Sequence, residues 1–301
     1  MILDYDAYLR LLTRQDPGFA VRSVAPMQQG WDSATLLVNG DTVFRFARRP
    51  DVEERLAREA RLLPQLAPAL PAAVPYFTRI GEEPASGAVA FVGYPLLPGE
   101  PLTLTGYSAE RVDALAGQLA AFLSALHRFS VAEAAQLGVP GGSTAEWRAE
   151  YAALYADFAE HCFPLLDEHE RARAVVLWEG YLGEPANFAF TPALIHRDLS
   201  PEHILHDAAT STLTGVIDWG DASIGDPAHD FTGITRSFGQ QFTQRVLARY
   251  SLPTEGSFWR RVAFYGAIGP FYSIRFGQLS GDEAHITRGL ELLGADLSRS
   301  L

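Results

Sequence analysis

The chain has 301 residues, 48% of them hydrophobic, and its 36 acidic and 24 basic side chains give a net charge of -12. This acidic balance argues against a nucleic-acid-binding surface and suits a cationic small molecule, although acidic excess is also a common aid to solubility. The longest uncharged run, residues 62–78, is interrupted by four prolines and therefore cannot form a membrane helix.

The ends and the cysteine content bear on the compartment. The first six residues lack the basic start and apolar core of a signal peptide, so a cytoplasmic protein is expected. Cys162 is the single cysteine, which excludes an intrachain disulfide and suits a reducing compartment. We expect Cys162 to be a small buried hydrophobe. The oligomeric state cannot be derived from these features.

The first third of the chain predicts a β-rich region with two helices. Helices are predicted over residues 4–13 and 51–66, where apolar side chains recur at helical spacing. The predicted strands cover residues 21–28, 34–38, 42–46, 76–80 and 89–94. Asn39 and Gly40 lie between the second and third strands and predict a tight hairpin, because both residues tolerate positive φ. The region is therefore expected to hold five antiparallel strands.

The remainder of the chain predicts mainly helices. Residues 108–129 carry apolar side chains at helical spacing behind Ser108, a suitable N-cap. Residues 146–182 predict one or two further helices that are rich in acids. These acids either line a cup for a polycationic ligand or form a solvated helix face.

Two motifs carry the chemistry. The first reads IHRDLSPEHIL from residue 195, and the second reads GVIDWGD from residue 215. In each motif a short β-type run is followed by an acidic residue, Asp198 or Asp218, and His203 lies in the polar loop between them. Phosphoryl transfer needs a carboxylate near the attacking hydroxyl and ligands that hold magnesium against nucleotide phosphates.

This arrangement resembles the catalytic and metal loops of the aminoglycoside phosphotransferase family, the kinase-like antibiotic phosphotransferases. His203 stands where a protein kinase has Asn, which is the version in aminoglycoside 2''-phosphotransferases and macrolide phosphotransferases. The resemblance implies an α+β, protein-kinase-like fold with two lobes. It places a five-stranded antiparallel nucleotide-binding lobe at residues 1–95 and a mostly helical lobe at 96–301.

The resemblance also implies roles for residues of the two motifs. Asp198 would orient the acceptor hydroxyl and take its proton, and Ser200 would contact the transferred phosphoryl group. His203 and Asp218 would hold Mg²⁺, with imidazole a less usual ligand because this ion prefers oxygen. Asp221 would bind a substrate amine or hydroxyl.

On the nucleotide side, the resemblance places Arg45 where the family usually has a lysine that touches the phosphates. Glu59 is the expected ion-pair partner of Arg45, and the Ser33 hydroxyl is expected to face a phosphate. The passage between the lobes includes Tyr94, Leu96 and Leu97, which are expected to contact the purine of ATP or GTP.

The expected activity is transfer of the γ-phosphoryl group of ATP or GTP to a hydroxyl of a small molecule, first of all an aminoglycoside antibiotic. Residues 231–280 depart from that pattern, because they hold many aromatics and only one acid, Glu255. This leaves a macrolide or a small metabolite such as choline or a sugar as the alternative acceptor. A nucleotide-binding pseudokinase is the third possibility, which the presence of both Asp198 and Asp218 disfavours.

Overall fold

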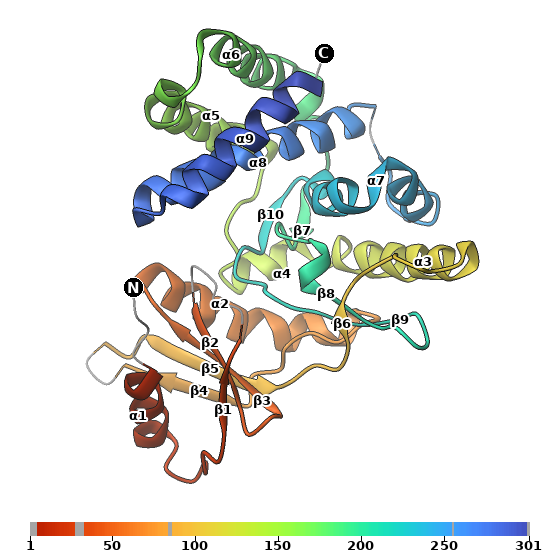
Figure 1. Ribbon diagram of the computed structural model, residues 1–301. Coiled ribbons are helices and arrows are strands. Elements are labelled where there is room, and N and C mark those ends of the chain that lie inside the picture. The colour runs from red at the N-terminus through yellow and green to blue at the C-terminus, as the bar shows by residue number, and fades with distance from the viewer. Residues whose placement is uncertain (1–4, 28–32, 84–85, 255, 300–301) are drawn as a thin grey trace.

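The computed structural model describes residues 5–27, 33–83, 86–254 and 256–299. The chain forms a small lobe with a sheet and two helices and a larger lobe that is mainly helical (Figure 1). The N-terminus lies on the small lobe and the C-terminus at the far end of the larger one (Figure 1). The expected kinase-like architecture is therefore present.

The small lobe is built on a five-stranded antiparallel sheet with the order β1-β2-β3-β5-β4. The strands are β1 (Val24–Pro26), β2 (Ser33–Val38), β3 (Thr42–Ala47), β4 (Arg79–Glu82) and β5 (Val89–Pro95). Asn39, Gly40 and Asp41 join β2 to β3, and the first two have φ angles of 58° and 78°. Both angles are positive, as a tight hairpin turn favours, so the predicted hairpin is confirmed.

Two strands differ from their predicted bounds. β1 is shorter than residues 21–28, and Gln28 lies outside the described residues. β4 begins at Arg79 instead of residue 76, and Tyr76 is 62% exposed. The apolar residues before β4 belong to a connecting segment in which Val74 is buried against the larger lobe, so their hydrophobicity reflects loop packing.

The two faces of the sheet are covered by different helices. On one face, Phe44 and Phe46 form a cluster with Leu12 of α1 (Tyr5–Gln15). Because side chains alternate along a strand, Arg45 lies on the opposite face, toward α2 (Pro50–Leu66). This alternation brings a buried arginine of the sheet to the helix that carries the expected partner acid.

The lobes share a core as well as a hinge. Leu62 and Leu66 near the end of α2 are buried in the main cluster of the larger lobe. Beyond the 3-10 turn η1 (Ala67–Ala69), Ala73 pairs with Gly215 of the larger lobe as an isolated parallel bridge. The division into two lobes between residues 95 and 96 stays a prediction. Residues 62–74 precede that division in the sequence, yet they pack against the larger lobe.

The larger lobe holds seven helices among the described residues, together with short strands and 3-10 turns. The helices are α3 (Ala109–Leu126), α4 (Val131–Gln136), α5 (Thr144–His161), α6 (Glu168–Leu182), α7 (Thr232–Leu247), α8 (Phe258–Ser280) and α9 (Glu283–Arg299). The strands are β6 (Glu100–Pro101), β7 (Ala193–Ile195), β8 (Ile204–Asp207), β9 (Thr212–Val216) and β10 (Ser223–Gly225), and the turns are η2 (Phe163–Leu165), η3 (Pro185–Phe188), η4 (Pro201–His203) and η5 (Pro227–Phe231). Ser108 caps α3 as predicted, since its hydroxyl accepts a hydrogen bond from Arg111 N.

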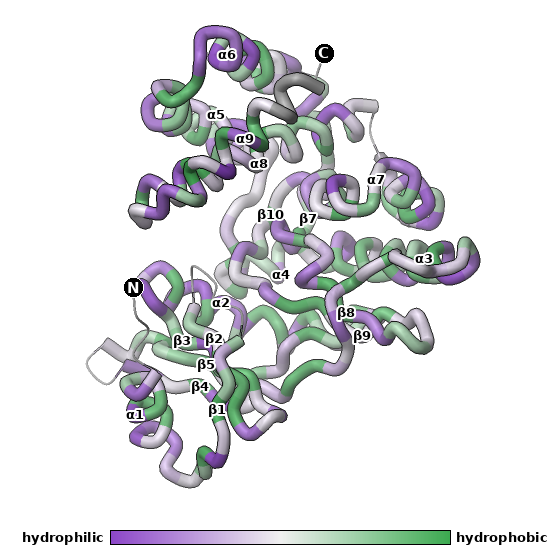
Figure 2. The backbone as a smooth tube through the Cα atoms, viewed as in Figure 1, coloured by the Kyte–Doolittle hydropathy of each residue, from purple (hydrophilic) through white to green (hydrophobic). Residues whose placement is uncertain are grey.

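Helices α5, α6, α8 and α9 form a layered group at the end of the larger lobe that is farther from the small lobe's sheet (Figure 1). Hydrophilic and hydrophobic stretches alternate along α6 and α9, as expected of helices with one buried face (Figure 2). Most aromatics of α8 are core residues, including Phe264, Tyr265 and Phe271. None of the described helices is long and apolar enough to cross a membrane.

Candidate active site

The catalytic loop leaves β7 and is fixed by a buried carboxylate. Asp230 of η5 accepts hydrogen bonds from the backbone N–H groups of His196 (2.9 Å) and Arg197 (2.7 Å). Arg197 has a φ of 71°, a conformation that a non-glycine residue adopts only where its surroundings hold it. Asp230 thus sets the sharp turn that precedes Asp198.

A second buried histidine supports this anchor from α3. His127 Nε2 lies 3.1 Å from Asp230 Oδ2, and its Nδ1 lies 2.7 Å from the Tyr250 hydroxyl. Desolvation alone would raise the pKa of Asp230, but the hydrogen bond and charge of His127 hold that pKa below its ordinary value. His127 therefore has a structural role, as a support for the Asp230 anchor.

Asp198 follows this turn and faces the space between the lobes. Its side chain is 52% exposed. Desolvation in the cleft raises the pKa of the Asp198 carboxyl against the opposing charge of His203, and Asp221 raises it further. A carboxylate with a raised pKa is a better proton acceptor, which suits a general base.

His203 folds back over the catalytic loop, as the sequence suggested. Its Nδ1 donates to the backbone oxygen of Asp198 (2.8 Å), so the Nε2 lone pair points the other way. Nε2 lies 3.7 Å from Asp218 Oδ2, and Nδ1 lies 3.5 Å from Asp198 Oδ2. The Ser200 hydroxyl is 3.4 Å from the same Nδ1.

Asp218 completes the centre from the segment after β9, with a φ of 66°. Arg45 Nη2 donates to Asp218 Oδ1 (3.2 Å), and Arg45 Nη1 donates to Glu59 Oε2 (2.7 Å). Desolvation alone would lower the pKa of Arg45, but Glu59 and Asp218 outweigh it and raise that pKa. The predicted Arg45–Glu59 pair is present, and Arg45 also reaches the expected metal ligand.

The structure can hold a hard cation only with help from a ligand. Across residues 5–27, 33–83, 86–254 and 256–299 there is no group of three or more His, Cys, Asp or Glu residues suited to a metal. His203 Nε2 and Asp218 Oδ2 still present two lone-pair donors side by side. Magnesium bound by one or two protein ligands and completed by phosphate oxygens would fit this pair.

A cavity of about 390 Å³ opens next to this centre, between the sheet and the larger lobe. Tyr94, Leu96 and Leu97 line it, as expected for the purine side, together with Arg45 and Asp218. Ser33 is buried at the start of β2, and its hydroxyl has no hydrogen-bond partner among the described residues. The glycine-containing turn at residues 28–32 lies outside those residues.

A family model described as "Phosphotransferase enzyme family" matches residues 23–265 of the chain. The chain belongs to this family of phosphotransferases. It is 29% identical over 286 residues to viomycin phosphotransferase from Streptomyces vinaceus, covering 93% of the chain and 96% of the relative.

Solved structures extend the comparison. The GDP and kanamycin complex of APH(2'')-IIIa is 31% identical, with a TM-score of 0.91 over 98% of this chain and 99% of that one. A macrolide 2'-phosphotransferase type I has a TM-score of 0.79 over 97% of this chain and 98% of that one, and its 22% identity supports the fold alone. The expected fold, family and enzyme class are therefore confirmed.

Around the loop after Asp218, the phosphotransferase has charged contacts that the sequence did not reveal. Asp221, expected to bind substrate, forms an ion pair with Arg55 of α2 at 2.6 Å. Arg58, one turn further along α2, donates to the backbone oxygen of Gly220 (2.6 Å). Arginines at this spacing beside Glu59 were a possible signal of contact with the metal loop, but a solvated helix face would look the same.

The acids of α5 and α6 also have partners. Glu146, Asp167 and Glu170 are used in helix capping boxes. Glu150 pairs with Arg197, and Asp157 pairs with Arg275 at 2.9 Å. The acidic run is therefore in large part structural.

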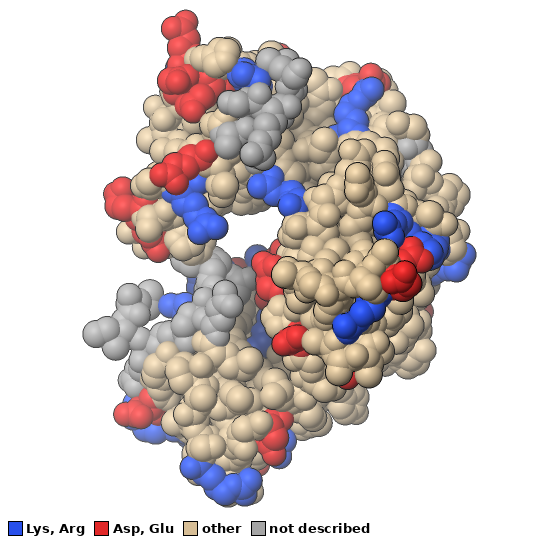
Figure 3. All heavy atoms as spheres, turned by 45° about the vertical axis from the view of Figure 1, so that its right-hand side comes forward, with Lys and Arg blue, Asp and Glu red and all other residues tan. Residues whose placement is uncertain are grey.

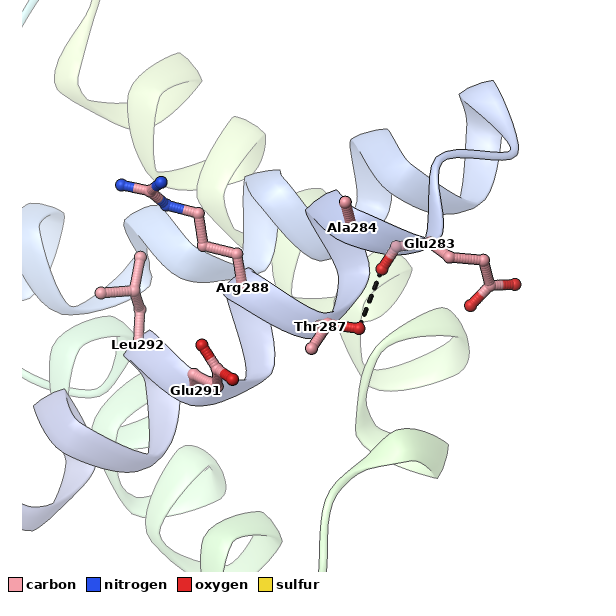
Figure 4. Close-up of a pocket in the computed structure, with 6 residues that line it drawn as sticks. All are labelled: Glu283, Ala284, Thr287, Arg288, Glu291 and Leu292. Carbon is pink, nitrogen blue, oxygen red and sulfur yellow. Dashed lines mark hydrogen bonds between the residues drawn. The ribbon is translucent and has the colours of Figure 1, made fainter.

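A separate hollow lies along the exposed face of α9 (Figure 4). It is lined by Glu283, Ala284, Thr287, Arg288, Glu291 and Leu292. All six residues belong to one helix, and the Thr287 hydroxyl donates to the Glu283 backbone oxygen (2.9 Å). The charged side chains spread outward instead of converging, so the hollow is a surface feature of the helix.

Proposed function

We propose that this phosphotransferase moves the γ-phosphoryl group of ATP or GTP to a hydroxyl of a small-molecule antibiotic. The observation that carries the proposal is the meeting of Asp198, His203, Asp218 and Arg45 at one cleft beside the 390 Å³ cavity. A base, two donors for a metal and a permanent cation are the groups that phosphoryl transfer needs. The GDP complex of the similar APH(2'')-IIIa supports a nucleotide in that cavity.

In the proposed reaction the acceptor oxygen attacks the γ-phosphorus as the bond to the leaving nucleoside diphosphate breaks. Asp198 orients the acceptor O–H and receives its proton. Arg45 places a guanidinium, fixed by Glu59, next to the phosphates. Catalysis then rests on positioning and on charge neutralisation by groups that are already in place.

His203 and Asp218 would hold Mg²⁺, which would neutralise phosphate charge when bound. Desolvation alone would raise the pKa of Asp218, but the charges of Arg45 and His203 hold it below its ordinary value. Asp218 therefore stays an anionic ligand at neutral pH. Ser200, close to His203, is placed to contact the transferred group.

Tyr94, Leu96 and Leu97 would enclose the purine, and Ser33 would contact a phosphate. The backbone N–H of Leu96 already donates to Asp41 O (2.7 Å), so recognition of the base falls to the neighbouring backbone groups. Tyr94 is buried at the back of the cavity. Either adenine or guanine is proposed as the base.

For the acceptor, an aminoglycoside is the first class to test, because the similar APH(2'')-IIIa was solved with kanamycin. A macrolide or a small metabolite is the second class. It is favoured by one observation, the arginine partners of Glu150, Asp157 and Asp221.

The test is a nucleotide-consumption assay with ATP and with GTP across aminoglycosides, macrolides, viomycin and small metabolites. We expect consumption that depends on one acceptor class. Asp198→Asn should lower turnover about 10²- to 10⁴-fold, the usual contribution of a general base. It should preserve nucleotide-induced thermal stabilisation, and Asp282→Asn, a control on the turn before α9, should change neither property. Nucleotide binding without acceptor-dependent consumption would instead indicate a pseudokinase.

A further inference from the structure

Three elements carry charged or aromatic side chains near the catalytic loop or next to one another: α5 with Glu150, which pairs with Arg197, the metal loop with Asp221, and α8, which packs on α5. Desolvation raises the pKa of Tyr272 of α8 to about 12, and the carboxylates of Glu150 and Asp221 raise it as well. Tyr272 is 41% exposed and packs edge-on against Phe158 of α5, with ring centroids 5.2 Å apart.

The surface continues away from Asp198 along both helices. Glu150 and Asp157 are two turns apart on one face of α5, and Tyr272 and Arg275 are one turn apart on α8. We call the surface formed by Glu150, Asp157, Asp221, Tyr272 and their arginine partners the acceptor wall. Figure 3 shows the molecule hollowed between the lobes, with acidic and basic side chains both bordering the opening.

Each carboxylate of the acceptor wall is engaged by an arginine. Asp157 receives a two-pronged contact from Arg275, with Nε at 2.9 Å and Nη2 at 3.2 Å. The remaining pairs are Glu150 with Arg197 and Asp221 with Arg55. The guanidinium of Arg197 also lies over the Trp147 ring, 5.1 Å from its centroid.

These pairs oppose a polycation. An ammonium group that approaches Glu150 or Asp157 competes with a guanidinium that already neutralises the carboxylate, and both pairs are only partly exposed to solvent. An arginine fork on a carboxylate is also better aligned than a single ammonium contact. A surface of paired charges with an exposed tyrosine suits an acceptor molecule that has rings and hydroxyls and carries at most one amine.

We infer that the acceptor wall selects hydroxyl acceptors with one positive charge or none, such as a macrolide, over polycationic aminoglycosides. The inference rests on the proposed function and chooses between its two acceptor classes. Arg275 and Arg197 act as specificity residues, because they occupy the carboxylates that ammonium groups would need.

The test measures acceptor binding by calorimetry, with transfer followed separately as nucleotide consumption. Kanamycin serves as the polycation and erythromycin as the acceptor with one amine. Wild-type protein should bind erythromycin more tightly. Arg275→Met removes the arginine from Asp157 and leaves the longer contact with His161 (3.4 Å). It should tighten kanamycin binding about fivefold, the scale of one partly exposed charge pair, with little change for erythromycin. Arg275→Met combined with Asp157→Asn should lose that gain.

The matched control is Arg249→Met, which removes an equal charge and breaks the 2.5 Å Arg249–Asp113 pair between α3 and the end of α7. It should leave both affinities unchanged. Tighter binding of kanamycin than erythromycin by the wild type, binding of neither, or no gain in Arg275→Met would overturn the inference. Tight erythromycin binding without consumption of ATP or GTP would remove the proposed phosphoryl transfer and leave the selectivity of the wall in place.

Discussion

Arg45 differs from the usual lysine of its family in what its side chain can reach. A single guanidinium donates to Glu59 on one side and to Asp218 on the other. An ammonium is a compact point charge and cannot present two separated donors in a fixed plane. The arginine therefore links α2, β3 and the metal loop through one side chain, in addition to its proposed contact with phosphate.

Two substitutions of Arg45 distinguish the effect of its positive charge from the effect of its two separate hydrogen-bond donors. Arg45→Lys should keep phosphate binding and lower kcat/KM for the nucleotide about tenfold, because one of the two carboxylate contacts is lost. Arg45→Met should lower kcat/KM about 10²- to 10³-fold, the usual effect of losing one donor to the reacting charge. Steady-state kinetics with varied ATP or GTP measures both effects.

Loss of the charge also affects the fold, because Arg45→Met leaves Glu59 buried without its ion pair. We expect a loss of about 3–5 kcal/mol in the free energy of unfolding, measured by denaturant titration. The double variant Arg45→Met with Glu59→Gln should recover much of that stability and none of the activity. Equal activity of Lys and Met at this position would show that Arg45 acts only in folding.

At the scale of elements, α2 holds the metal loop in place. Arg55 and Arg58 lie on successive turns of α2, and both contact the loop after Asp218, at the Asp221 carboxylate and at the Gly220 oxygen. The loop lies close to the helix, since a Cβ on Gly220 would be only 3.6 Å from Glu59 Oε1. The orientation of Asp218 thus depends on a helix of the other lobe.

We predict that Arg58→Met lowers kcat and raises the Mg²⁺ concentration needed for half-maximal activity several-fold. The substitution removes a charged hydrogen bond worth about 1.5–3 kcal/mol at a loop that positions a metal ligand. Titration of activity with Mg²⁺ at saturating nucleotide measures the change. Arg61→Met is the matched control, because Arg61 Nε donates to the Leu137 oxygen, also across the lobes but away from the metal loop. A similar shift in both variants would mean that general lobe packing is responsible.

At the scale of the whole molecule, sequence patterns predicted the features that depend on interactions between residues near each other in the chain. The Asn39-Gly40 hairpin, the Ser108 cap and the order of the two motifs depend on neighbouring residues. The Arg45–Glu59 pair was reached through the family resemblance. The contact between Arg55 and Asp221 spans 166 positions and follows from how the lobes pack, which no periodicity encodes. The arginine partners of the α5 acids were hidden for the same reason, so a structural ion-paired surface looked like a possible cationic cup.

The same packing gives the whole molecule a pH-dependent stability. His229 packs between Trp147 and Tyr265, and desolvation lowers its pKa to about 3, while desolvation also lowers the pKa of the buried His196. Below an unfolded pKa of about 6.5 the unfolded chain takes up a proton that the folded chain refuses, so stability falls as pH falls. The raised pKa of His203 affects stability only above pH 6.5, and the lowered pKa of Asp230 affects it only below about pH 4. The raised pKa of Asp198, about 7, acts within the window in the opposite direction, because the folded chain binds that proton before the unfolded chain does.

We therefore predict that His229 and His196 each lower the free energy of unfolding between pH 6.5 and 4.5, by at most about 1.4 kcal/mol per pH unit, against the opposing contribution of Asp198. His229→Gln removes one titrating group and should make this slope shallower, whatever its effect on stability at pH 7. Denaturant unfolding at half-unit pH steps measures the slope. His285→Gln, at an exposed position early in α9, is the control and should retain the wild-type slope. Identical slopes for wild type and His229→Gln would show that His229 accepts a proton in the folded protein as readily as in the unfolded chain.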